Sequence, residues 1–189
     1  MTISKQAVRQ KYFDSVKQIS KEERRKKEKI ICQKLFKLDV WKKAKTIALT
    51  LPTVNEVSLA LVFEQARLEH KKIVVPITLP QYQMVFVEYK KETPLQKTQF
   101  GVFEPILEQA VICPKEQLDL IIVPGVSYSK DGQRIGFGGG YYDRFLADFK
   151  KNKVSLAYDF QIYDEAIWQS EATDITLDMI ISEKEVYIS

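Results

Sequence analysis

The chain has 189 residues, 45% of them hydrophobic, and a formal net charge of +4. This length falls within the range of one domain, and the apolar share is enough to bury a core, which excludes a compositionally disordered chain. Two cysteines and one histidine exclude a zinc finger or another site built on Cys/His spacing. The first ten residues lack a signal-peptide core and no apolar run could span a bilayer, so we expect a cytoplasmic protein with a single domain, residues 1–189.

The charge is distributed unevenly along the chain. Residues 1–45 contain fifteen Lys/Arg against five Asp/Glu, whereas the remainder contains fourteen against twenty. A basic segment on an acidic body favours a polyanionic partner, which could be a nucleotide, a polyanionic small molecule or nucleic acid. A solvated helical face is the alternative explanation of the same charges.

Two helices are expected in this basic segment. The first has an apolar stripe at helical spacing, formed by Val8, Tyr12, Val16 and Ile19. The second begins with Ser20 and has Glu23 three residues later, which is typical of a capping box. Its predicted buried face consists of Ile30, Ile31, Leu35 and Leu38.

Strands and helices alternate after residue 45. The expected strands lie in residues 46–52, 72–78, 84–89, 119–124, 153–159 and 178–183. The second is expected to stop around Pro76, and the last is expected to be the final strand of the fold. Helices are expected over residues 58–71 and from Tyr141 to about Lys151, and the proline-containing residues 90–115 are expected to be irregular. This order predicts a single-domain α/β fold with a mainly parallel sheet flanked by helices on both faces.

Ligands of such sheets gather beyond the carboxyl ends of the strands. Three predicted strands end just before Glu56, before Tyr82 and before a glycine-rich run. Segments that are distant in the sequence could therefore share one pocket.

Five of the seven glycines fall between Gly132 and Gly140, a stretch called the glycine segment below. Bare backbone N–H groups before a helix, together with the guanidinium of Arg134, suit a phosphate. The segment is not a Walker loop, because no Lys-Ser/Thr follows the last glycine, and its spacing is not G-x-G-x-x-G. A tight turn that needs glycine for positive φ is the alternative.

The run PGVSYSKDGQRIGFGGGYYDRFL, residues 124–146, resembles the signature of the 5-formyltetrahydrofolate cyclo-ligase (methenyltetrahydrofolate synthetase) family. Other segments are similar to family blocks in the same order: the Lys5/Arg9 pair, LTLPTVNEV, FGVFEP, SLAYDFQ and TDITLD. The resemblance spans nearly the whole chain, although only the glycine block is highly specific.

The resemblance implies that the chain uses ATP and Mg²⁺ to convert 5-formyltetrahydrofolate to 5,10-methenyltetrahydrofolate, releasing ADP and phosphate. Transfer of the γ-phosphoryl group to the formyl oxygen would turn a poor leaving group into phosphate, and the neighbouring amine of the folate would then close the ring. Such a transfer requires alignment and charge neutralisation. The implied partners are ATP and the folate, with or without a polyglutamate tail; no nucleic acid or membrane is expected, and a monomer is slightly favoured.

The resemblance also implies a role for individual residues. ATP would be bound by Lys5, Arg9, Arg134, Ile135, Gly136, Phe137, Gly138, Gly139, Gly140, Tyr141 and Tyr142. The folate would be bound by Arg9, Leu51, Glu56 and Tyr141. Mg²⁺ would be held by Asp143 and Asp174, and the catalytic residues would be Arg134 and Tyr141. Tyr82 and Phe100 are weaker candidates for packing on the folate rings, since aromatic residues at such positions are more often core.

Each role has a simpler alternative. Lys5 and Arg9 could be surface cations of a basic helix, and Asp143 could be an ordinary acid in the first turn of a helix. Asp174 could be a solvated loop acid, and Glu56 could belong to the first turn of the next helix.

The chain also departs from the family pattern at two places. Gly139 stands where many members have a lysine, and Thr173 precedes Asp174 without the Pro and His that members often have nearby. Two other functional classes stay open on the sequence: a nucleic-acid-binding protein with a basic N-terminus, and a sugar-phosphate or acyl-CoA enzyme on a similar sheet.

Overall fold

The computed structural model describes residues 2–51, 53, 55–98 and 101–189, so Pro52 and Phe100 lie outside the described residues. Its helices are α1 (Lys5–Gln18), α2 (Lys21–Lys37), α3 (Asp39–Lys43), α4 (Ala60–Leu68) and α5 (Tyr141–Leu146), with 3-10 turns at Pro80–Tyr82, Leu107–Gln109, Lys115–Gln117 and Asp159–Gln161. Its strands are β1 (Thr46–Ala48), β2 (Lys72–Leu79), β3 (Gln83–Glu88), β4 (Leu95–Lys97), β5 (Phe103–Pro105), β6 (Ile112–Cys113), β7 (Leu120–Ile122), β8 (Ser127–Ser129), β9 (Arg134–Ile135), β10 (Asn152–Leu156), β11 (Ile162–Tyr163), β12 (Met179–Ile181) and β13 (Val186–Ile188).

Within the described part of the chain, eight strands form one sheet in the order β13-β12-β10-β7-β1-β2-β3-β6. The central strands β12, β10, β7, β1 and β2 run parallel, whereas β13, β3 and β6 are antiparallel additions at the edges. Strands β11, β8 and β9 form a smaller sheet, and β4 pairs with β5. The prediction of a mainly parallel α/β sheet is confirmed.

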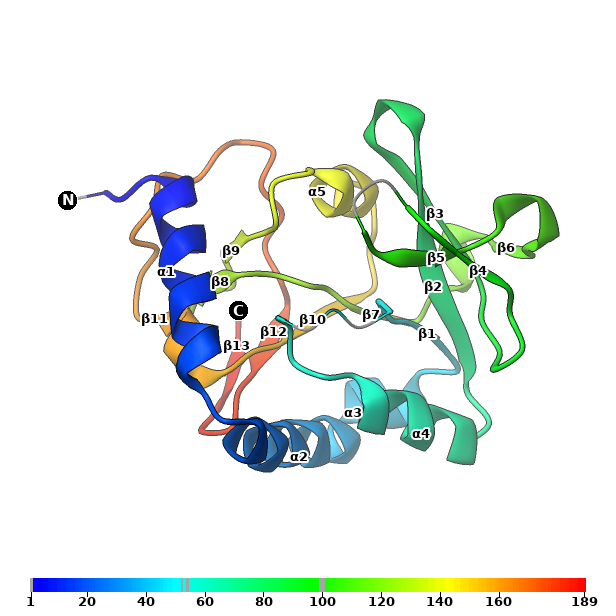
Figure 1. The fold of residues 1–189 in the computed structure, drawn as a ribbon, viewed down its shortest axis with the longest axis horizontal. Coiled ribbons are helices and arrows are strands. Elements are labelled where there is room, and N and C mark those ends of the chain that lie inside the picture. Colours follow the sequence, from blue (N-terminus) through cyan, green and yellow to red (C-terminus); the bar gives the residue numbers. More distant parts are fainter. Residues whose placement is uncertain (1, 52, 54, 99–100) are drawn as a thin grey trace.

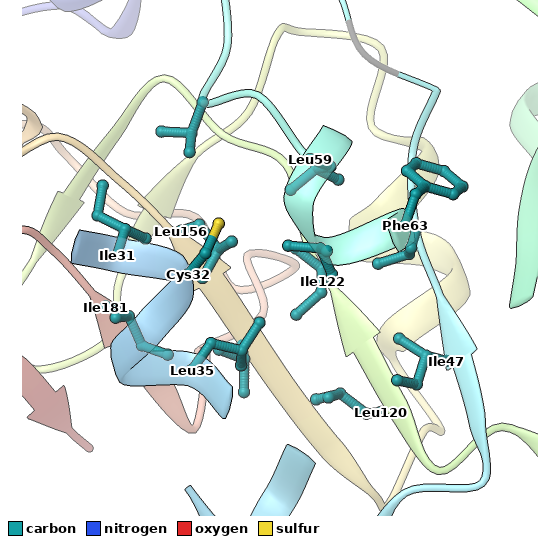
Figure 2. Packing of buried hydrophobic residues seen from close by; sticks show 14 of the residues in the cluster. Ile31, Cys32, Leu35, Ile47, Leu59, Phe63, Leu120, Ile122, Leu156 and Ile181 are labelled. Carbon is teal, nitrogen blue, oxygen red and sulfur yellow. The ribbon is translucent and has the colours of Figure 1, made fainter. Parts of the chain in front are cut away.

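Helices cover both faces of this sheet, as predicted. Figure 1 shows α2, α3 and α4 on one side and α5 on the other. Along β1, Ile47 faces the core shared with α2 and α4, whereas Ala48 faces the core shared with α5. This alternation follows from the two-residue period of a strand. Figure 2 shows Leu35 of α2 and Leu120 of β7 within the first of these cores.

Helix α2 begins where the sequence predicts. Ser20 Oγ accepts the N–H of Glu23 at 3.1 Å, which caps α2. The predicted stripe of α1 is buried at Val8, Tyr12 and Val16. The predicted face of α2 is wrong at Ile30, which is 42% exposed. Cys32 is buried in its place, since a helix advances about 100° per residue.

Four other expectations need correction. Strand β2 continues past Pro76 to Leu79. The backbone nitrogen of Pro76 is directed to the β1 side, where pairing with β1 has already ended at Val74, so the missing N–H costs no hydrogen bond of the sheet. Helix α5 ends at Leu146, well before residue 151. It is followed by a turn in which the N–H of Phe149 donates to the carbonyl of Leu146. Short strands β4, β5 and β6 lie within residues 90–115, and β13 follows the strand expected to be last.

Among the described residues, no helix has the length and apolarity needed to cross a membrane.

Candidate active site

The glycine segment is part hairpin and part approach to a helix. Strands β8 and β9 pair antiparallel, and Gly132, with φ +88°, lies in the turn between them. Gly138 and Gly140, with φ +108° and +66°, occupy the left-handed region that favours glycine. A hairpin therefore intervenes between β7 and α5, in place of the single strand-to-helix turn that the sequence suggested. Phe137, Gly138 and Gly139 are exposed, so this part of the backbone is accessible to a ligand.

Arg134 is buried at the base of the glycine segment. Its side chain is 2% exposed, and its Nη2 donates to Asp143 Oδ1 at 2.8 Å. Its Nη1 donates to the carbonyl of Pro124 at 3.0 Å, just beyond β7, while Nε has no hydrogen-bond partner among the described residues. A Cβ at Gly136 would stand 2.8 Å from Nη1, so glycine at this position makes room for the guanidinium. The predicted phosphate cation thus also links the hairpin to α5.

Helix α1 brings the two other predicted cations to this region. Arg9 Nε donates to the carbonyl of Gly136 at 2.9 Å. One helical turn earlier, Lys5 Nζ lies 2.7 Å from Asp174 Oδ2 and 3.0 Å from Glu171 Oε1. Partial burial lowers the pKa of Lys5, but its hydrogen bonds to the two carboxylates outweigh this and raise it. Residues from both ends of the sequence therefore meet at the glycine segment.

The two predicted metal ligands lie on adjoining segments. Asp143 Oδ1 also accepts the N–H of Ile175, the residue after Asp174, at 3.3 Å. Each carboxylate has its other oxygen without a hydrogen-bond partner among the described residues. Those residues contain no group of three or more His, Cys, Asp or Glu side chains able to hold a metal ion. Magnesium commonly uses one or two carboxylates with phosphates and water, so this pair of oxygen donors fits Mg²⁺ in the presence of ATP.

The predicted folate residues follow β1. Glu56 accepts a hydrogen bond from Thr53 Oγ1 at 2.5 Å, and burial raises the pKa of its carboxyl. It lines a small pocket with Thr50 and Gly125, at the carboxyl ends of β1 and β7. The pocket volume of about 20 Å³ is room for about one water molecule. Leu51 is half-buried and packs against the neighbouring core.

The predicted aromatic residues are distributed over two environments. The centroids of the Tyr141 and Tyr82 rings lie 5.8 Å apart, and Tyr82 is 54% exposed. A Cβ atom at Gly139 would stand 2.8 Å from Cδ2 of Tyr141. A glycine at position 139 therefore lets the Tyr141 ring lie against the backbone. The hydroxyl of Tyr142 is buried without a hydrogen-bond partner in the described residues, and burial raises its pKa. Ile135 is buried in the core, so only its backbone could reach ATP.

Sequence reasoning missed several residues around Glu56. Tyr12 and Gln161 line the same pocket, and Tyr12 Oη donates to the carbonyl of Asn55. Arg24 Nη2 donates to the carbonyl of Glu56 itself at 3.0 Å. The helical spacing assigns Tyr12 to the core, and Arg24 sits within a run of surface cations, so no local signal distinguished either residue.

Exposed glycine backbone, a buried Arg–Asp pair and further carboxylates beyond the carboxyl ends of a parallel sheet are features typical of α/β enzymes that handle phosphates. The model of the 5-formyltetrahydrofolate cyclo-ligase family matches residues 1–183. The chain belongs to this family.

Individual relatives agree with this assignment. A 5-formyltetrahydrofolate cyclo-ligase of Haemophilus influenzae is 32% identical over 139 residues, covering 71% of this chain and 74% of that protein. The solved structure of the Aquifex aeolicus 5,10-methenyltetrahydrofolate synthetase is 33% identical, with a TM-score of 0.83 and coverage of 97% and 92% of the two chains. That of the Mycoplasma pneumoniae 5,10-methenyltetrahydrofolate synthetase is 27% identical, with a TM-score of 0.77 and coverage of 96% and 99%. These similarities confirm both the fold class and the enzyme family.

Proposed function

We propose that this chain converts 5-formyltetrahydrofolate to 5,10-methenyltetrahydrofolate with Mg-ATP, releasing ADP and phosphate. Family membership supports the folate reaction. The observation that carries the ATP dependence is that Arg9 and Asp143 contact the glycine segment, Arg9 at Gly136 and Asp143 at Arg134. Cations, accessible glycine backbone and a paired carboxylate are the groups that phosphoryl transfer requires.

The proposed reaction has two stages. The formyl oxygen attacks the γ-phosphorus of ATP, the bond to ADP breaks, and an iminium phosphate forms. The neighbouring amine of the folate then attacks the formyl carbon, loses its proton, and expels phosphate as the ring closes. Glu56 would accept hydrogen bonds from the amino and ring N–H groups of the pterin, which fixes the formyl group relative to the glycine segment. A pterin is larger than the pocket beside Glu56, so the bound ring would extend beyond it or displace lining side chains.

The remaining residues would manage charge. Lys5 and Arg9 lie on one face of α1 and would meet the phosphates of ATP, while the exposed backbone of residues 137–139 would supply N–H donors. Arg134, with Nε unpartnered among described residues, would offset the charge that develops during transfer. Asp143 and Asp174 would hold Mg²⁺, which would supply positive charge to neutralise the phosphate oxygens. Tyr141 would pack on the folate beside Gly139.

An absorbance assay for methenyltetrahydrofolate tests the proposal. Purified, folded protein is incubated with 5-formyltetrahydrofolate, with and without ATP and with and without Mg²⁺. We expect product only when all three are present. Absence of product under every condition would refute the proposal, and product without ATP would refute its phosphoryl-transfer step. The relatives described above are named cyclo-ligases or methenyltetrahydrofolate synthetases, which favours a folate reaction over nucleic-acid binding and over the chemistry of a sugar-phosphate or acyl-CoA enzyme.

A further inference from the structure

A polar bridge joins the basic helix α2 to the segment that carries Glu56. Arg24 Nη2 donates to the carbonyl of Glu56 at 3.0 Å, and its Nε donates to Tyr158 Oη at 3.1 Å. The Tyr158 hydroxyl in turn donates to Glu28 Oε1 at 2.6 Å, and Glu28 Oε1 accepts the N–H of Ser58 at 3.1 Å. The bridge therefore fixes the backbone on both sides of Val57.

The bridge depends on the geometry of α2. Arg24 and Glu28 are four residues apart, so both side chains lie on the same face of the helix. Arg24 is half-buried, unlike its exposed neighbour Arg25. A guanidinium has several donors in a rigid fork and can bond a carbonyl and a hydroxyl at once, which an ammonium does less well. Part of the N-terminal basic charge thus serves an internal purpose.

The bridge also continues to the glycine-segment side of the site. Tyr158 is fully buried just after β10, and its N–H donates to Gln161 Oε1 at 2.8 Å. Gln161 Nε2 donates to the carbonyl of Val126 at 2.9 Å, in the stretch between β7 and β8. The position of Glu56 is thereby tied to the segment that leads into the predicted ATP site.

We propose that Arg24 and Glu28 are positioning residues, which hold the Glu56 carboxylate where the folate substrate meets it. The inference rests on the proposed function. Substrate-contacting groups must be held within a fraction of an ångström, and the supporting contacts decide whether they are. The Glu56 side chain has a hydrogen bond only to Thr53 among the described residues, so its placement depends on its backbone.

Equilibrium binding of 5-formyltetrahydrofolate, measured by calorimetry without ATP, tests the proposal. Arg24→Gln should raise the Kd and the KM for the folate about tenfold, because the charge-assisted hydrogen bonds of the guanidinium, including the one to the Glu56 carbonyl, are lost. The KM for ATP should stay unchanged. The matched control Arg25→Gln, one residue away on the exposed side of α2, should leave all three values unchanged. Arg24→Lys, which keeps the charge without the fork, should fall between Arg24→Gln and the unmodified protein.

A double variant separates positioning from general damage. If Arg24 acts through Glu56, Arg24→Gln should weaken folate binding little further in a Glu56→Gln background. Additive losses would overturn the proposal, as would an unchanged folate Kd in Arg24→Gln or an equal rise in both KM values. If Arg24→Gln does not fold, Tyr158→Phe removes only the bridging hydroxyl, and an unchanged folate Kd in that variant would equally overturn it. Absence of folate binding by the unmodified protein would refute the proposed function itself, which distinguishes the two failures.

Discussion

Replacing Arg134 by alanine should destabilise the protein as well as impair catalysis. The guanidinium and the Asp143 carboxylate are 2.8 Å apart, with side-chain exposures of 2% and 23%. Removing one partner of a buried ion pair costs about 3–5 kcal/mol, because the other charge is left without compensation. Asp143 keeps some contact with water and with the N–H of Ile175, which places the expected loss near the lower limit, at about 3 kcal/mol.

Thermal and urea unfolding would measure this loss. For a protein of this size, about 3 kcal/mol corresponds to a fall in Tm of roughly 6–12 °C. Arg25→Ala is the control, since Arg25 is exposed on α2 and its loss should cost no more than about 0.5 kcal/mol. A Tm for Arg134→Ala within about 2 °C of the unmodified protein would show that the pair contributes little, and that Arg134 is held chiefly for the ligand.

Two further predictions concern the ligands. Asp143→Asn should raise the Mg²⁺ concentration for half-maximal activity about tenfold or more, because a neutral amide is a poorer ligand for a hard cation; the exposed Asp148→Asn is the control, and an unchanged requirement in Asp143→Asn would remove Asp143 from the metal site. Burial raises the pKa of Glu56, so its carboxyl stays protonated up to a higher pH than that of an exposed glutamate. Folate affinity should therefore fall as the pH is lowered through this raised pKa, and Glu56→Gln should abolish this pH dependence of the affinity. The same pH dependence in the glutamine variant would show that another group is responsible for it.

Much of the fold could be predicted because its strongest signals are local. The cap at Ser20 and the stripe through Val8 and Tyr12 depend on residues within one or two turns, and the apolar run of β7 is long enough to indicate a strand buried on both faces. The predictions were wrong where contacts with a distant segment determine the extent or the presence of a strand. Pro76 fits within β2 only because β1 has already ended, and β13 forms only because β12 presents a free edge.

The candidate site divides in the same way. The glycine segment could be found because its composition is unusual within a few residues, and Arg9 does lie against it. The ion pair of Lys5 with Asp174 could not be foreseen, since it joins parts of the chain that lie far apart in the sequence. The ion pair of Arg134 with Asp143 spans only nine residues, but it depends on the β8–β9 hairpin, which the sequence did not predict. The bridge from Arg24 could not be predicted for a different reason: the sequence spacing does not distinguish this half-buried cation from the many other lysines and arginines around it.

The contacts of α1 affect how the protein folds while it is being synthesised. This helix is made well before its partners, because Gly136 follows Arg9 by 127 residues and Asp174 follows Lys5 by 169 residues. During synthesis the apolar side chains of α1 therefore lack some of their final packing partners, because a domain that depends on distant contacts cannot complete its fold until the later segments leave the ribosome. The nascent protein is thus expected to acquire its ligand site late in folding, when α1 meets Gly136 and Asp174.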